Sequence, residues 1–281
     1  MGKYWSFNGL ARPVSKKCPV PRKNTVGARS MGLPYNERMM SVGDPVVHTV
    51  GARTLGRYLV ASPTGAGPAP LLVGFHGYGE NAERHLRALR AVPGVEHWQI
   101  ASIQALHRFY QTKTGDVVGS WMTNQDREHA INDNVAYVRN VVAELRSTVA
   151  PDQNADTDTP LVYAGFSQGV AMAYRAALHA GHRCDGLIVL AGDIPPELQD
   201  EPADRWPPIL LGVGRNDQWY TEAKLRADQA FLESGPISFD TVVFDGGHEW
   251  HDDFYQAAGR FLARIRTRER ERHEVPQPST S

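Results

Sequence analysis

This chain of 281 residues has few cysteines, almost no net charge and no long apolar run. Its two cysteines, Cys18 and Cys184, have neither a metal-binding nor a redox-type spacing, so we expect reduced thiols without a chemical role. The formal net charge of -1 gives no overall field that would favour nucleic acid or an anionic membrane as a partner. No stretch of about 18 apolar residues is present, so no membrane-spanning helix is expected. Together these features favour a small, neutral or weakly charged substrate.

The first 44 residues differ from the rest, because they carry lysines and arginines but no acidic residue before Glu37. They show no hydrophobic periodicity, and we expect a disordered basic extension. The apolar segment of a secretory signal is absent, which favours a cytoplasmic protein. Alternatives for this region are a translation start at Met31, Met39 or Met40, an organellar transit peptide, or N-myristoylation at Gly2.

Short apolar runs alternate with helical patterns from residue 57 onward, and most of the runs lack polar alternation. Such runs are typical of strands that are buried on both faces. We predict strands at 57–60, 71–75, 98–103, 161–164, 186–191, 209–213 and 240–244. We predict helices at 82–91, 126–149, 170–180 and 222–234, and a last helix that ends near residue 266. Residues 104–122, which are mixed and aromatic, are expected to form a long surface loop.

This alternation predicts an α/β fold with a mostly parallel central sheet and helices on both faces. We expect a single catalytic domain over 45–267, followed by a charged tail that contains Pro and Ser and is disordered over 268–281. In such sheets, functional sites form at the carboxyl ends of the strands. The chemically suggestive segments follow the strands that end at Phe75, Ile103, Ala164, Val213 and Phe244.

A Gly-Phe-Ser-Gln-Gly pentapeptide at 165–169 lies between a predicted strand and a predicted helix. A serine at such a turn is held in a strained conformation that lifts its hydroxyl clear of the sheet, which makes Ser167 the candidate nucleophile. A serine hydroxyl also needs a general base and a carboxylate that orients the base. In the order typical of α/β-hydrolases the acid follows the serine and the histidine comes last, which indicates Asp217 and His248. Asp193 is the rival acid, since it also follows a strand.

Backbone N–H groups must stabilise the oxyanion that forms when a carbonyl is attacked. One donor is expected from the residue after the nucleophile, Gln168, and another from the early glycine-rich loop, at Tyr78. The residues expected to line the substrate pocket are His76, His107, Trp121 and Trp219. A metal site is not expected at His248 to His251, because the His-Glu-x-x-His spacing is missing.

The chain resembles the phospholipase/carboxylesterase family of α/β-hydrolases, which includes small bacterial carboxylesterases and acyl-protein thioesterases. The resemblance rests on the Phe-His-Gly-Tyr-Gly-Glu segment at 75–80, the pentapeptide at 165–169, Gly-Arg-Asn-Asp at 214–217 and Gly-Gly-His at 246–248. It implies an α/β-hydrolase fold, a Ser167, Asp217 and His248 triad, oxyanion donors at Tyr78 and Gln168, and no cofactor. The segment 104–122 departs from the usual loop of the family, so the acyl preference does not follow from the resemblance.

The expected function is hydrolysis of carboxylic esters through an acyl-enzyme intermediate, with a small-molecule ester as substrate and a monomer or homodimer as the assembly. The alternatives are an acyl-thioesterase or a lysophospholipase. A peptidase or a non-catalytic binding module with the same fold is a second alternative. The sequence does not discriminate between ester, thioester and lysolipid.

Overall fold

The computed structural model describes residues 45–65, 69–149 and 159–274. The chain divides into two units, Met1–Gly51 and Ala52–Ser281. In the first unit, residues 45–51 form no helix or strand and are exposed. The predicted basic extension at 1–44 lies outside the described residues. All elements below belong to the second unit.

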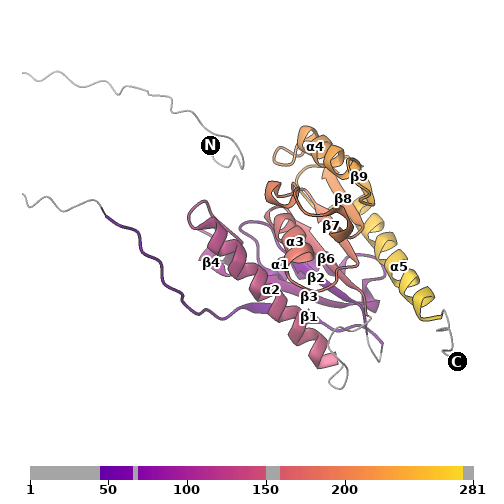
Figure 1. The fold of residues 1–281 in the computed structure, drawn as a ribbon, viewed down its shortest axis with the longest axis horizontal. Helices are drawn as coiled ribbons and strands as arrows, with labels where there is room; N and C mark the ends of the chain where they lie inside the picture. Colours follow the sequence, from indigo (N-terminus) through magenta and orange to yellow (C-terminus); the bar gives the residue numbers. More distant parts are fainter. Residues whose placement is uncertain (1–44, 66–68, 150–158, 275–281) are drawn as a thin grey trace, which may run out of the picture. The chain divides into compact units, whose positions relative to one another are not determined.

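A sheet of seven strands forms the centre of this unit, in the order β1-β3-β2-β6-β7-β8-β9 (Figure 1). The strands are β1 (Arg57–Ala61), β2 (Leu71–Phe75), β3 (Gln99–Gln104), β6 (Leu161–Phe166), β7 (Gly186–Leu190), β8 (Ile209–Gly214) and β9 (Phe239–Phe244). Only β1 pairs antiparallel, with β3, and every other neighbouring pair in this sheet is parallel. The prediction of a mostly parallel central sheet is therefore confirmed.

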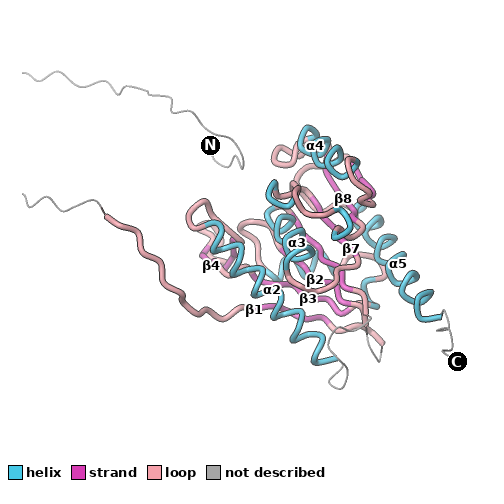
Figure 2. Tube along the Cα trace, viewed as in Figure 1, coloured by secondary structure: helices cyan, strands magenta, loops and turns pink. Residues whose placement is uncertain are grey.

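Helices cover both faces of the sheet, as predicted (Figure 2). The helices are α1 (Ala82–Arg90), α2 (Arg127–Val149), α3 (Gln168–His179), α4 (Glu222–Glu233) and α5 (Asp252–Glu274), and the short 3-10 helices are η1 (Val95–His97), η2 (Pro196–Leu198) and η3 (Ala203–Arg205). Along β2, Leu71, Val73 and Phe75 belong to one apolar cluster, which also contains residues of α2, α3 and α4. Leu72 belongs to a second apolar cluster on the opposite face, which also contains residues of α1 and α5. Because alternate residues of one strand enter two different cores, the strand reads as a continuous apolar run.

The prediction of a loop over 104–122 was wrong for residues 107–110 and 117–120. β4 (His107–Tyr110) and β5 (Val117–Ser120) form an antiparallel hairpin. Both strands have only four residues and β4 is exposed throughout, so no apolar alternation marked them in the sequence. The hairpin is held against the loop after β2, because Gly119 exchanges backbone hydrogen bonds with Gly79 at 3.0 Å and with Glu80 at 2.8 Å.

The last helix is longer than predicted. α5 continues to Glu274 instead of ending near residue 266, so the expectation of disorder is wrong for residues 268–274. Apolar packing ends at Ile265, and the residues beyond it are mainly Arg and Glu, which have high helix propensity and need no core contact. Residues 275–281 lie outside the described part of the chain.

Asp228 of α4 joins two loops at the carboxyl edge of the sheet. Its Oδ2 accepts hydrogen bonds from the Tyr220 hydroxyl at 2.7 Å, after β8, and from the Ile194 N–H at 3.2 Å, after β7. The carboxyl group is buried, and burial raises its pKa to about 6 even though both hydrogen bonds favour the ionised form. Asp228 therefore fixes the loop that carries Asp217 at the cost of holding a carboxyl group away from water.

We expect Asp228→Asn to become more stable relative to the wild type as the pH rises. The folded chain holds the Asp228 proton more tightly than the unfolded chain, so the stabilisation is complete below about pH 4 and is lost as the pH rises through about 6. The asparagine variant keeps an oxygen acceptor and cannot ionise, so between pH 4 and pH 8 its free energy of unfolding should gain up to about 3 kcal/mol relative to wild type. Urea unfolding at several pH values measures this. Asp204→Asn, on an exposed residue, is the control, and a difference that does not change with pH would contradict the expectation.

Candidate active site

The turn between β6 and α3 places Ser167 in a backbone conformation that residues with side chains rarely adopt. Its φ is 53° and its ψ is -121°. A Cβ atom at Gly165 would lie 2.6 Å from the Gly169 carbonyl oxygen, and one at Gly169 would lie 2.0 Å from the Phe75 carbonyl oxygen. Both obstacles are backbone atoms, so only glycine permits this close approach of strand and helix. The packing around the turn therefore stabilises the strained conformation of the serine.

The side chains of Ser167, His248 and Asp217 form a continuous hydrogen-bonded line. His248 Nε2 lies 2.8 Å from Ser167 Oγ, and His248 Nδ1 lies 2.8 Å from Asp217 Oδ2. An ionised carboxylate only accepts hydrogen bonds, so Nδ1 must carry the proton and Nε2 is left to accept one from the serine. The three residues come from the carboxyl ends of β6, β8 and β9. In this arrangement a base is hydrogen-bonded to the serine hydroxyl, and a carboxylate is hydrogen-bonded to the base.

The hydrogen bonds that Asp217 accepts stabilise its ionised form. Its side chain is inaccessible to solvent, and Oδ1 accepts the backbone N–H groups of Trp219 at 2.8 Å and Tyr220 at 3.0 Å. Burial alone would raise the pKa of Asp217, but the hydrogen bonds from His248 and from these two N–H groups outweigh it and hold the pKa below its usual value. Asp217 can therefore orient His248 and stabilise its protonated form.

The rival acid, Asp193, lies in a different environment. Its side chain is 37% exposed and pairs with Lys224 of α4 at 3.3 Å. His248 Nδ1 is already engaged by Asp217. The geometry therefore favours Asp217 over Asp193 as the partner of the histidine.

Both predicted oxyanion donors lie beside the serine turn. Gln168 is the first residue of α3, where backbone N–H groups have no acceptor inside the helix. The loop that carries Tyr78 touches the turn, since a Cβ at Gly77 would lie 3.1 Å from the Phe166 ring and one at Gly169 would lie 2.7 Å from the His76 carbonyl oxygen. Gly79 has a φ of 69°, which favours glycine and lets the loop turn back toward β5.

The side chain of Gln168 has a role that the sequence did not reveal. Its Oε1 accepts the Trp121 N–H at 2.9 Å, and its Nε2 donates to the Met122 carbonyl oxygen at 3.0 Å. The residue after the serine thus holds the segment after β5 against the start of α3. Nothing in the sequence marks this pairing, because a primary amide can bond to any nearby backbone group.

The four residues predicted to line the substrate pocket occupy different environments. His76 and Trp121 are completely buried, and Trp121 Nε1 donates to the His76 carbonyl oxygen at 2.8 Å. His107 is exposed on β4. Trp219 is half exposed beside Asp217. Of these four residues, His107 and Trp219 expose their side chains to solvent, whereas His76 and Trp121 lie in the core beside the serine turn.

A cavity of about 770 Å³ lies at the other edge of the sheet, near the amino ends of β6, β7 and β8. Pro160, Cys184, Trp206 and Arg268 are among its lining residues, and none of the candidate catalytic residues is. It therefore does not contribute to the serine site.

The described residues contain neither a metal-binding cluster nor a membrane-spanning helix. No group of three or more His, Cys, Asp or Glu side chains there is arranged to hold a metal ion. None of the helices in those ranges is long and apolar enough to cross a membrane.

Known structures with the same fold include several hydrolases. Acyl-protein thioesterase 2 of Zea mays aligns with a TM-score of 0.58 at 19% identity, over 75% of this chain and 99% of its own. The Bacillus cereus carboxylesterase aligns with a TM-score of 0.57 at 14% identity, over 75% and 95%. A phospholipase/carboxylesterase from Dyadobacter fermentans aligns with a TM-score of 0.54 at 20% identity, over 76% and 100%. At these identities the likeness shows the α/β-hydrolase fold alone.

Sequence comparisons give the family. A search of curated proteins found no significant match. The family model described as Phospholipase/Carboxylesterase matches residues 58–265, which include all but the first residue of the sheet and all three residues of the hydrogen-bonded line. The chain belongs to the phospholipase/carboxylesterase family of α/β-hydrolases.

Proposed function

We propose that this hydrolase is a serine carboxylesterase that cleaves small carboxylic esters through an acyl-enzyme intermediate. The observation that carries the proposal is the line from Ser167 to His248 to Asp217, with a distance of 2.8 Å at each step. In this proposal Ser167 is the nucleophile, His248 the general base and Asp217 the residue that orients the base. The N–H groups of Gln168 and Tyr78 form the oxyanion hole.

With the groups in these positions, the reaction has two halves, acylation of the serine and hydrolysis of the acyl-enzyme. His248 Nε2 takes the proton from Ser167 Oγ as the oxygen attacks the ester carbonyl, and the negative charge on the carbonyl oxygen is stabilised by the two N–H groups. His248 then gives its proton to the leaving alcohol, and the acyl group stays on Ser167. Water repeats the sequence with His248 again as base, which releases the acid and restores the serine. No cofactor is required by this chemistry.

An acyl-thioesterase is the second candidate, and it needs the same five groups. It is favoured by the likeness of the fold to acyl-protein thioesterase 2 of Zea mays. The exposed aromatic pair of Tyr78 and Phe109, with ring centroids 5.6 Å apart, lies next to the proposed oxyanion donor. An apolar acyl chain of either an ester or a thioester could pack on this pair.

We expect Ser167→Ala to abolish both ester turnover and covalent labelling by a fluorophosphonate, because both reactions need the Ser167 oxygen. Labelling is followed by intact-protein mass spectrometry. Ser234→Ala, at the exposed end of α4, is the control and should be labelled like the wild type. Labelling of the Ser167 variant at the wild-type rate would refute the nucleophile.

Asp217→Asn should lower kcat by about 10³- to 10⁴-fold with little change in KM, because the amide no longer fixes the tautomer of His248. Asp193→Asn is the matched control, since the same change is made at the rival acid, and its kcat should stay within about twofold of wild type. Steady-state kinetics on a p-nitrophenyl ester measure both variants. The reverse ranking would assign the acid to Asp193.

A panel of p-nitrophenyl esters, acyl-thioesters and lysolipids at matched acyl length separates the two candidates. We expect the highest kcat/KM on the oxygen esters. A kcat/KM that is tenfold or more higher on the thioesters would replace the carboxylesterase proposal by the second candidate.

A further inference from the structure

His76 is the one residue of the glycine-rich loop whose side chain reaches back into the core. Its Nε2 accepts the Ala105 N–H at 3.1 Å, so that nitrogen carries no proton. The proton of the neutral ring is then on Nδ1, which donates to the Gly77 carbonyl oxygen at 2.7 Å. Two backbone groups therefore determine the tautomer of the ring.

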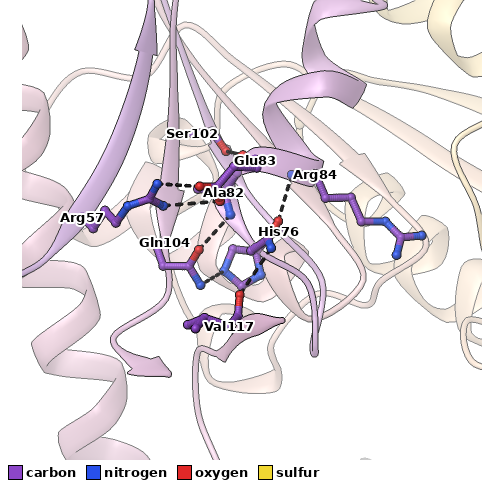
Figure 3. Close-up of polar contacts among 9 residues, drawn as sticks. Arg57, His76, Ala82, Glu83, Arg84, Ser102, Gln104 and Val117 are labelled. Atoms are coloured by element: carbon purple, nitrogen blue, oxygen red, sulfur yellow. Dashed lines mark hydrogen bonds and ion pairs between the residues drawn. The ribbon is translucent and has the colours of Figure 1, made fainter. Parts of the chain in front are cut away.

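The surroundings of His76 keep the ring neutral and in place. The residue is completely buried, and burial lowers its pKa to about 4. Figure 3 shows Gln104 between the ring and the start of α1, where Gln104 Oε1 accepts the Ala82 N–H at 2.8 Å. The Gln104 Nε2 atom lies 3.4 Å from His76 Nε2. On another side of His76 lies the Trp121 ring, and the two ring centroids are 5.2 Å apart.

The hydrogen bond to Gly77 sets the orientation of one peptide plane. The Gly77 carbonyl oxygen accepts from His76 Nδ1 and also from the Glu80 N–H at 3.2 Å. A trans peptide is planar, with its C=O and its N–H on opposite sides. Holding the Gly77 carbonyl toward His76 therefore fixes the direction of the Tyr78 N–H, which belongs to the same plane.

We propose that His76 is a positioning residue that holds the Gly77–Tyr78 peptide so that the Tyr78 N–H is directed at the oxyanion. The inference rests on the proposed function, in which that N–H is one of the two oxyanion donors. His76 does not touch the substrate in this role. It stabilises the transition state by removing the cost of turning the peptide during the reaction, since donors that are already oriented need no reorganisation.

Two substitutions test the roles of the two ring nitrogens of His76 separately. His76→Asn places an amide N–H close to the position of Nδ1 and keeps the donor to Gly77. His76→Gln reaches the position of Nε2, where its oxygen can accept from Ala105, but it loses the donor to Gly77. His97→Gln, at an exposed histidine of η1, is the control for the change of residue type.

We expect His76→Asn to keep kcat/KM within about tenfold of wild type and His76→Gln to lose roughly 10²-fold, as expected for a misdirected oxyanion donor. The loss should fall on kcat with KM nearly unchanged. The affinity for an alkyl trifluoromethyl ketone, which forms an oxyanion on the serine, should fall in parallel. If His76 had a purely structural role, the loss of activity in each variant would follow the decrease in its melting temperature. Equal losses of kcat/KM in the two variants would overturn the inference.

The ring tautomer gives a test that does not depend on enzymatic activity. Long-range ¹⁵N NMR of the wild-type protein labelled at histidine should show His76 protonated at Nδ1 and unprotonated at Nε2 at pH 7. The signal is assigned by its absence in the better-folded His76 variant. A proton on Nε2 would overturn the inference whether or not the enzyme is active. Wild-type protein that neither hydrolyses esters nor reacts with a fluorophosphonate would instead overturn the proposed function.

Discussion

The contact on which the site depends is the approach of the start of α3 to the end of β2. At Gly169 the backbone passes so close to the Phe75 carbonyl oxygen that even a methyl group would lie 2.0 Å from it. This contact brings the glycine-rich loop after β2 against the serine turn after β6. It also explains why two segments about 90 residues apart in sequence can supply groups to one carbonyl. Moving either strand end would separate the nucleophile from one of the proposed oxyanion donors.

A second layer of polar side chains holds the loops around this contact. Gln168 ties the segment after β5 to α3, Asp228 ties α4 to the loops after β7 and β8, and Gln104 ties β3 to the start of α1. Each is a buried or half-buried side chain with a hydrogen bond to at least one backbone group of another element or loop. Because an unpaired buried polar group is costly, each such pairing has one favoured geometry and so restricts the loops to it.

The sheet, its helices and the meeting of three candidate residues at one edge were predictable from the sequence for a common reason. Continuous apolar runs report strands buried on both faces, and the order of those strands places Ser167, Asp217 and His248 at one edge. The hairpin was missed because β4 is exposed along its whole length, and the end of α5 was missed because its last turns are helical without an apolar face. The connections of Gln168, Gln104 and Asp228 were not predictable, since they depend on which backbone groups the finished fold brings within reach.

His76 also shows that contacts formed only in the finished fold are not visible in the sequence. Its place beside two glycines in a candidate oxyanion loop indicated a substrate contact, because sequence gives proximity along the chain but not the side to which a side chain turns. In the structure the ring is buried, and its hydrogen bonds to Ala105 and Gly77 make it part of the loop's support. A histidine whose pKa burial lowers to about 4 is also poorly suited to exchange protons near pH 7. The proton chemistry of the proposed reaction is then left to His248, which contacts both the serine and the acid.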